Sequence, residues 1–177
     1  MKPKSSVLLL VCCFYFATTS IAQSNIFLKL DGIDGPVTQK GFEKWIQVTG
    51  VEQATTNAVT MGGSGGSASV GKVKFSEFRV KKAIDKTSPL LLLNTSSGKH
   101  IPKATIVFTG FDGIATYTIT LTDVILTGVT TISECNPPCK TSEMVTIAFG
   151  KAEWVFKDKA GVITKGGWDA VRNTAIN

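Results

Sequence analysis

The stretch Thr116-Tyr117-Thr118-Ile119-Thr120-Leu121-Thr122 decides the fold class of this chain. Large apolar side chains and threonines alternate strictly along it. Successive side chains of a β-strand point to opposite faces, so this alternation predicts a strand with one buried face and one solvated face. Threonine, isoleucine and tyrosine also favour the pleated backbone. A half-buried β-sheet is therefore the first expectation.

Weaker versions of the alternation surround this strand and predict six to eight strands in all. They lie at residues 26–30, 45–51, 73–82, 101–109, 124–131 and 144–157. In the last segment the apolar parity changes near Gly150, which predicts a β-bulge at that glycine. Bulged, strongly curved strands suit a small barrel. The predicted fold class is mainly β, a small β-barrel of two packed sheets with one short α-helix.

The predicted helix begins at Ser88, a good N-cap residue, with Pro89 in the first turn, where its missing N–H is harmless. Leu90–Leu93 supply apolar surface, and Gly98 can end the helix in the left-handed conformation. Strands are expected on both sides of it, so the helix must cap or cross the sheets.

The N-terminus has the pattern of a secretory signal peptide. Lys2 and Lys4 precede an apolar run of 11 residues, 7–17, followed by polar residues. A helix needs about 20 apolar residues to cross a bilayer, so no stable membrane anchor is expected. Small residues up to Ala22 predict cleavage there, which leaves residues 23–177 as a single domain that is secreted or periplasmic.

Two cysteines, Cys135 and Cys139, remain after this cleavage. In an exported protein such a close pair favours a disulfide over free thiols. No other metal ligand of the cysteine or histidine type lies nearby, because His100 is the chain's only histidine. Neither a metal site nor a cofactor site is predicted.

Charge gives little indication of nucleic-acid binding. The net charge of +6 falls to +4 once Lys2 and Lys4 are removed. The best candidate for a basic cluster would have side chains that alternate between the two faces of a strand, and it lacks aromatic residues that could stack on bases. It consists of Lys72, Lys74, Arg79, Lys81 and Lys82.

Signals for enzymatic activity are weak. The segment 66–72 matches the first seven positions of a phosphate-binding loop, but Val73 stands where a serine or threonine is needed. Ser–His–Asp catalysis would have to use His100, which lies in a predicted turn. We therefore expect a protein that is not an enzyme and has no catalytic residues.

Several blocks, in order, resemble the haemolysin-coregulated protein (Hcp) family of type VI secretion. They are residues 27–35, 75–78, 81–89, 97–101, 121–125, 148–154 and 167–169, and together they extend across the 155 residues that follow the leader. The resemblance implies a small barrel that assembles head-to-tail into a hexameric ring, and rings that stack into a tube. It implies a structural role, with the type VI spike, the sheath or small effectors in the ring lumen as further partners.

The glycine-rich segment gains a role from this resemblance, because the corresponding long loop of the family contacts a neighbouring subunit or ring. The candidate inter-subunit residues are Met61, Gly62, Gly63, Ser64, Gly65, Gly66 and Ser67. The leader and the cysteine pair depart from the family, whose tube subunits assemble in the cytoplasm. A secreted monomeric binding or carrier module, similar to an adhesin, is therefore the alternative function, and a secreted enzyme is the third.

Overall fold

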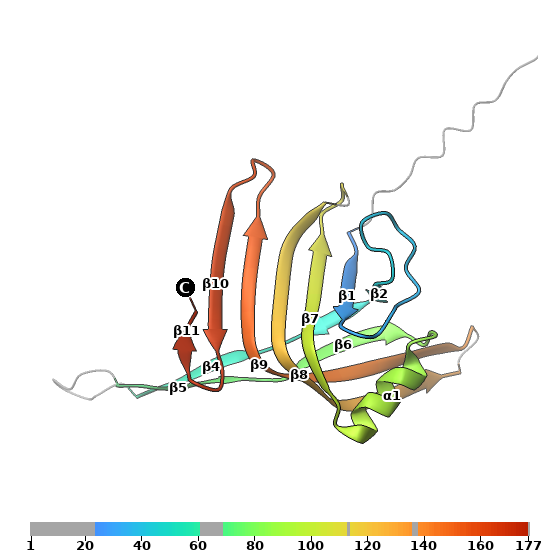
Figure 1. The fold of residues 1–177 in the computed structure, drawn as a ribbon, viewed down its shortest axis with the longest axis horizontal. Helices are drawn as coiled ribbons and strands as arrows, with labels where there is room; N and C mark the ends of the chain where they lie inside the picture. The colour runs from blue at the N-terminus through green and yellow to red at the C-terminus, as the bar shows by residue number, and fades with distance from the viewer. Residues whose placement is uncertain (1–23, 61–68, 113, 136–137, 177) are drawn as a thin grey trace, which may run out of the picture.

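A computed structural model describes residues 24–60, 69–112, 114–135 and 138–176. The predicted leader (1–22) and the candidate inter-subunit loop (61–67) lie outside these residues. The described part contains eleven strands and one helix (Figure 1). They are β1 (Ile26–Leu30), β2 (Ile46–Val48), β3 (Gly50–Glu52), β4 (Thr55–Thr60), β5 (Ser69–Phe75), β6 (Phe78–Ala83), α1 (Ser88–Ser97), β7 (His100–Thr109), β8 (Ala115–Glu134), β9 (Lys140–Lys157), β10 (Ile163–Asp169) and β11 (Thr174–Ala175).

The predicted class, mainly β with one short helix, is confirmed, but the predicted number of strands was too low. Residues 73–82 are two strands, because β5 pairs with β4 whereas β6 pairs with β9. Residues 45–51 likewise divide at Thr49, since β2 pairs with β1 and β3 pairs with β6. Alternation of side chains indicates an extended backbone, but it carries no information about a change of partner.

Nine of the strands form one strongly curved sheet, and β4 and β5 form a second sheet of two strands. In the large sheet β1 pairs with β7, β7 with β8, β8 with β9 and β9 with β6. The segment 46–52 completes a closed circuit of paired strands, because β2 pairs with β1 and β3 pairs with β6. β10 and β11 extend the sheet beyond β9 as a flap outside this circuit. The hydrogen-bonded ladders thus enclose the core as a small barrel.

A crease runs across β8 and β9 at the level of Gly150. On β8 the buried residues change parity between Leu121 and Val124, and on β9 between Ile147 and Ala152. The pairing register is unbroken there, since Thr122 pairs with Lys151 and Val124 with Phe149. The predicted bulge at Gly150 is therefore wrong.

The change of face comes instead from Asp123, which lies opposite Gly150 and has a φ of 55°. A Cβ at Gly150 would lie 2.9 Å from the Cβ of Asp123, so glycine is required where the strands approach. The register of β8 on β9 does shift, but between Leu126 and Gly128. The apolar pattern along a strand shows where the buried face changes. It cannot show whether a residue with a positive φ on one strand or an extra residue on the other causes the change.

The core lies inside this curved sheet. Its fully buried side chains come from every strand of the circuit except β3 and include Leu28, Ile46, Val80, Ile106 and Leu121. Helix α1 adds Leu91, which is also fully buried. Residues as far apart in the chain as Leu28 and Ala152 thus share one apolar interior.

Thr87 and not Ser88 is the N-cap of α1, so the first helical residue is Ser88 and not Pro89. The Ser88 hydroxyl does not cap the helix; it donates to Glu143 Oε1 at 2.8 Å. Gly98 ends the helix with a φ of 61°, as predicted. Within the described ranges, no helix is both long and apolar enough to cross a membrane.

Candidate functional site: the projecting arm and the exposed sheet edge

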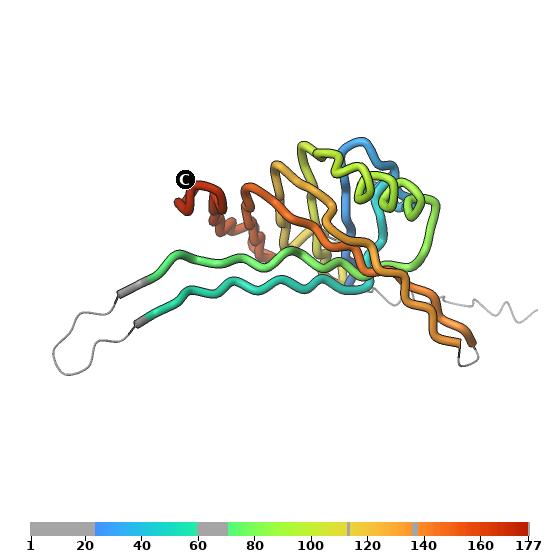
Figure 2. Tube along the Cα trace, turned by 90° about the horizontal axis from the view of Figure 1, so that it is seen from below, coloured from blue at the N-terminus to red at the C-terminus, as the bar shows by residue number. Residues whose placement is uncertain are grey.

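The two-stranded sheet of β4 and β5 projects from the barrel as an arm, and the β8–β9 hairpin projects at the other end of the molecule (Figure 2). The arm strands pair antiparallel from Thr55↔Phe75 to Thr60↔Ser69, with an irregularity between Asn57 and Val59. The arm therefore carries the chain on both sides of the predicted inter-subunit loop, which itself lies outside the described residues.

Aromatic side chains hold the base of the arm against the barrel. The Phe75 ring stacks on Trp154 with 6.2 Å between ring centroids, and meets Phe149 edge-on at 5.9 Å. The Ser76 amide donates to Ala54 O, and the Ala54 amide donates to the Ser76 hydroxyl, both at 2.8 Å. The position where the arm leaves the barrel is thus determined by packing and by a pair of hydrogen bonds.

The arm itself buries little. The β4 side chains from Thr55 to Val59 are exposed, and so are Lys72 and Lys74 on β5. An isolated two-stranded hairpin is marginally stable in water, and unpaired strand edges are ready to pair with another chain. The arm is therefore a surface that needs a partner.

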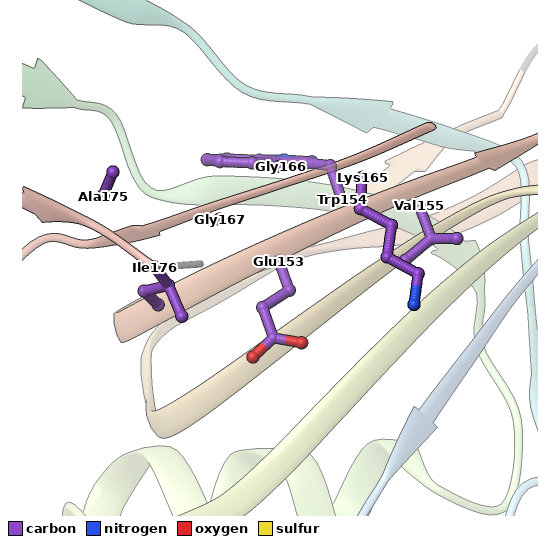
Figure 3. A pocket seen from close by; sticks show the side chains of 8 residues that line it. All are labelled: Glu153, Trp154, Val155, Lys165, Gly166, Gly167, Ala175 and Ile176. Atoms are coloured by element: carbon purple, nitrogen blue, oxygen red, sulfur yellow. The ribbon is translucent and has the colours of Figure 1, made fainter. Parts of the chain in front are cut away.

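A second exposed edge lies on β10, which pairs with β11 only at Trp168 and Asp169. The Gly167 carbonyl also accepts a hydrogen bond from the Ile176 amide, at 3.0 Å, so the open edge of β10 is made by the residues before Gly167. A hollow of about 550 Å³ lies here, where the Glu153 and Lys165 side chains project to one side of the β9–β10 ladder and Trp154 to the other (Figure 3). A Cβ at Gly167 would lie 3.0 Å from the Cβ of Ile176, so this glycine lets the chain return after β11.

Asp169 determines how the chain turns from β10 to β11. Its Oδ1 accepts hydrogen bonds from the amides of Arg172 at 2.8 Å and Val171 at 3.0 Å. The Arg172 amide is the main cause that lowers the pKa of Asp169, and Lys151 contributes through its charge. The carboxylate is thus stabilised in its charged form beside the open edge.

The basic residues that looked clustered in the sequence are separated by the fold. Lys82 is fully buried, and its Nζ lies 2.6 Å from Glu143 Oε1 and 3.1 Å from Asp85 Oδ1. Lys72 and Lys74 instead lie on the arm. Lys82 therefore links β6, β9 and the start of α1, and it does not belong to a basic surface.

Another charged group ties the β1–β2 connection to the sheet. Asp34 contacts the ammonium of Lys29 at 2.9 Å and that of Lys44 at 3.0 Å. Hydrogen bonds from these two lysines lower the pKa of Asp34 from 3.8 to about 2.

Cys135 and Cys139 form the predicted disulfide. It lies just beyond the last rung of the β8–β9 ladder, Glu134↔Lys140. Both residues are exposed at the end of the hairpin. The disulfide therefore closes the end of the projection opposite the arm.

The residues considered for catalysis are not brought together. His100 is exposed at the start of β7, and no hydrogen bond or ion pair to its imidazole is formed within the described part of the chain. Lys72 of the segment similar to a phosphate-binding loop lies in a strand, where no helix N-terminus could hold a phosphate. Among the described residues, no group of three or more potential metal ligands occurs.

Comparison with known proteins agrees with this architecture. The family model for the type VI secretion system effector Hcp matches residues 27–156. No curated protein matches the sequence significantly.

Solved structures are similar over nearly their full length. Hcp1 from Salmonella typhimurium is 27% identical, with a TM-score of 0.75 over 86% of this chain and 99% of that one. A type VI secretion system effector from Yersinia pestis is 26% identical, with a TM-score of 0.64 over 81% and 98%. A type six secretion system protein with 23% identity shares the fold, with a TM-score of 0.79 over 87% and 100%. The chain therefore belongs to the Hcp family of type VI secretion, whose members are structural proteins and not enzymes.

Proposed function

We propose that residues 23–177 self-associate outside the cytoplasm into hexameric rings that can stack, as an exported structural protein of Hcp type. The observation that carries this proposal is the arm of β4 and β5, which stands away from the barrel with both edges unpaired. Its backbone groups and its exposed Val59 gain a partner only from another molecule.

The second open edge supports a ring made of identical contacts. The arm and the β10 edge are different surfaces of one chain, so a contact between them is heterologous. Heterologous contacts close into a ring when the rotation between neighbours closes. The number of six subunits comes from the family resemblance.

Export is supported by the cysteine pair. Disulfides persist in oxidising compartments and are rare in the cytoplasm. Cys135–Cys139 is therefore consistent with removal of the leader and release from the cytoplasm. Any type VI spike, sheath or effector would then meet this protein outside the cytoplasm.

Light scattering after size exclusion tests the assembly. Residues 23–177 should elute at six subunit masses. In a matched variant, an Asn-Gly turn replaces residues 57–73, which keeps the Thr55↔Phe75 rung and the Phe75–Trp154 stack. This shortened protein should fold, as shown by its far-UV circular dichroism, and should elute at one subunit mass.

Two outcomes would count against the proposal. If residues 23–177 elute at one subunit mass, the ring is absent and the secreted monomeric binding or carrier module takes its place. If the shortened variant still forms the native assembly, the arm is not the contact element.

A further inference from the structure

The disulfide between Cys135 and Cys139 is open to solvent and lies apart from the apolar core. Both cysteines are exposed. The last side chain of β8 that packs against the core is Val129, and the first of β9 is Val145. Beyond these residues the hairpin carries the cysteines away from the barrel (Figure 2). A dissolved reagent can therefore reach the disulfide while the barrel stays folded.

Backbone pairing, and not the disulfide alone, brings the two cysteines together. The β8–β9 ladder runs without interruption from Gly128↔Thr146 to Glu134↔Lys140, the rung next to the cysteines. On its other side β9 pairs with β6 as far as Ala83↔Ser142. The folded chain therefore holds the two cysteines side by side whether or not their sulfur atoms are bonded.

The disulfide and the fold depend little on each other. The bond closes a loop of only five residues, Cys-Asn-Pro-Pro-Cys. In the chain-entropy account, a disulfide stabilises a fold by restricting the unfolded chain, and a short loop gives little restriction. Thermodynamic coupling is reciprocal, so a bond that adds little to the fold also gains little from it. Folding therefore gives this disulfide little protection against reduction.

The charges at the end of the hairpin do not repel a charged thiol. Glu134 and Lys140 are exposed and place one charge of each sign beside the two cysteines. Most small thiols of cells carry carboxylates, and an excess of acidic residues here would keep them away. The end of the hairpin has no such excess.

We infer that Cys135 and Cys139 form a thiol–disulfide exchange site of the folded protein, whose reaction partner is a small-molecule thiol of the glutathione class. Exposed disulfides are the labile and regulatory ones, whereas structural disulfides resist reduction. The site goes beyond the proposed self-association and does not depend on it.

The exchange proceeds in two displacements. A thiolate attacks the Sγ atom of one cysteine and forms a mixed disulfide, and the electron pair of the broken S–S bond leaves with the other Sγ. A second thiolate then attacks the sulfur of the bound thiol and releases the first cysteine. Two thiols thus become one small-molecule disulfide, and their two electrons and two protons end on Cys135 and Cys139. The oxidised form of the small thiol drives the reverse reaction.

This chemistry makes the end of the hairpin respond to the compartment. In an oxidising compartment the pair remains a disulfide. In a compartment rich in thiols it becomes a dithiol, while the ladder and the barrel are unchanged. The competing possibility is a purely structural disulfide that thiols reach only when the protein unfolds.

The rate of reduction separates these two possibilities. Oxidised residues 23–177 are mixed with reduced glutathione without denaturant, free thiols are alkylated at intervals, and the mass of the chain is measured. The rate should rise in proportion to the glutathione concentration, because no unfolding step comes first. Far-UV circular dichroism recorded in parallel should not change.

Equilibrium in buffers of reduced and oxidised glutathione is the second measurement. It is made on the folded protein and on the protein unfolded in urea. Folding should shift the balance toward the disulfide by no more than about 30-fold, which corresponds to about 2 kcal/mol.

Two variants control the assignment. Cys135→Ser leaves Cys139 as the single exposed thiol, and the folded variant should take up one glutathione from the oxidised form. The double variant Cys135→Ser with Cys139→Ser should take up none. Both variants should fold, because the ladder is complete without the bond.

Three results would overturn the inference. The first is a rate of reduction that becomes independent of glutathione concentration and equals the rate of unfolding. The second is a shift on folding beyond about 30-fold, and the third is a folded dithiol that oxidised glutathione does not convert to the disulfide. All three are measured as masses of the single chain, so they hold whether or not the proposed ring forms.

Discussion

At the scale of single residues, Lys82 shows how a charge can serve the interior of the fold. It lies two residues after Val80 on β6, so the two side chains point to the same face of the strand, and both are fully buried. The Lys82 ammonium is surrounded by Glu143 at 2.6 Å, Asp85 at 3.1 Å and Ala83 O at 2.8 Å. A buried charge is tolerated when it is paired and hydrogen-bonded. Lys82 therefore holds the start of α1 against β6 and β9.

Replacing Lys82→Met should lower the free energy of unfolding by about 3–5 kcal/mol, because Glu143 would remain buried without its partner. Lys81→Met is the matched control, since Lys81 is an exposed neighbour on the same strand, and it should change the stability by less than about 0.5 kcal/mol. Urea unfolding followed by tryptophan fluorescence measures both. Equal stabilities of the two variants would show that the buried pair does not hold this corner. The double variant Lys82→Met with Glu143→Leu should recover part of the loss.

At the scale of elements, the long strands β8 and β9 have two structural roles. Most of their length closes the barrel, including residues 142–147 of β9, which pair with β6, and the ends near Glu134 and Lys140 form the projecting hairpin. The crease at Asp123 and Gly150 lets the same two strands present a buried face on both sides of the bend. The disulfide lies at the tip, beyond a ladder that already holds the two strands in register.

Replacing both Cys135→Ser and Cys139→Ser should lower the free energy of unfolding by only about 1–2 kcal/mol. The disulfide closes a loop of five residues, and the Glu134↔Lys140 rung and the two prolines within the loop already restrict the unbonded chain. Urea unfolding gives the difference. Thiol titration of unfolded protein from an oxidising compartment should find no free thiol, and two reactive thiols per chain would contradict the pairing. Assembly through the arm should survive, because the arm lies at the other end of the molecule.

At the scale of the whole molecule, the compartment in which the protein acts depends on the predicted leader. A fusion of residues 1–30 to a reporter that is active only outside the cytoplasm should give a signal, because the charged start and the apolar run of 11 residues suffice for entry into the translocon. The control places Leu9→Arg and Leu10→Arg within that run and should give none. Retention in the cytoplasm of the full chain with residues 1–22 intact would instead place this protein with the cytoplasmic tube subunits.

The sequence by itself determined the features that depend on neighbours along the chain. Alternation at Thr116–Thr122 predicted a strand, Gly98 predicted the end of the helix, and the spacing of Cys135 and Cys139 predicted their disulfide. Each of these rests on the conformation of a few consecutive residues, which local side-chain chemistry controls. The blocks that resemble the Hcp family then added the expectation of a small barrel.

Only the tertiary structure decided which distant residues meet. Lys82 shares the buried face of β6 with Val80, but its partner Glu143 lies 61 positions away, so the sequence of β6 alone could not show that the ammonium would be paired. The change of face at Gly150 arises from Asp123, a residue on the neighbouring strand. Such features depend on long-range pairing, which periodicity within a single segment does not encode.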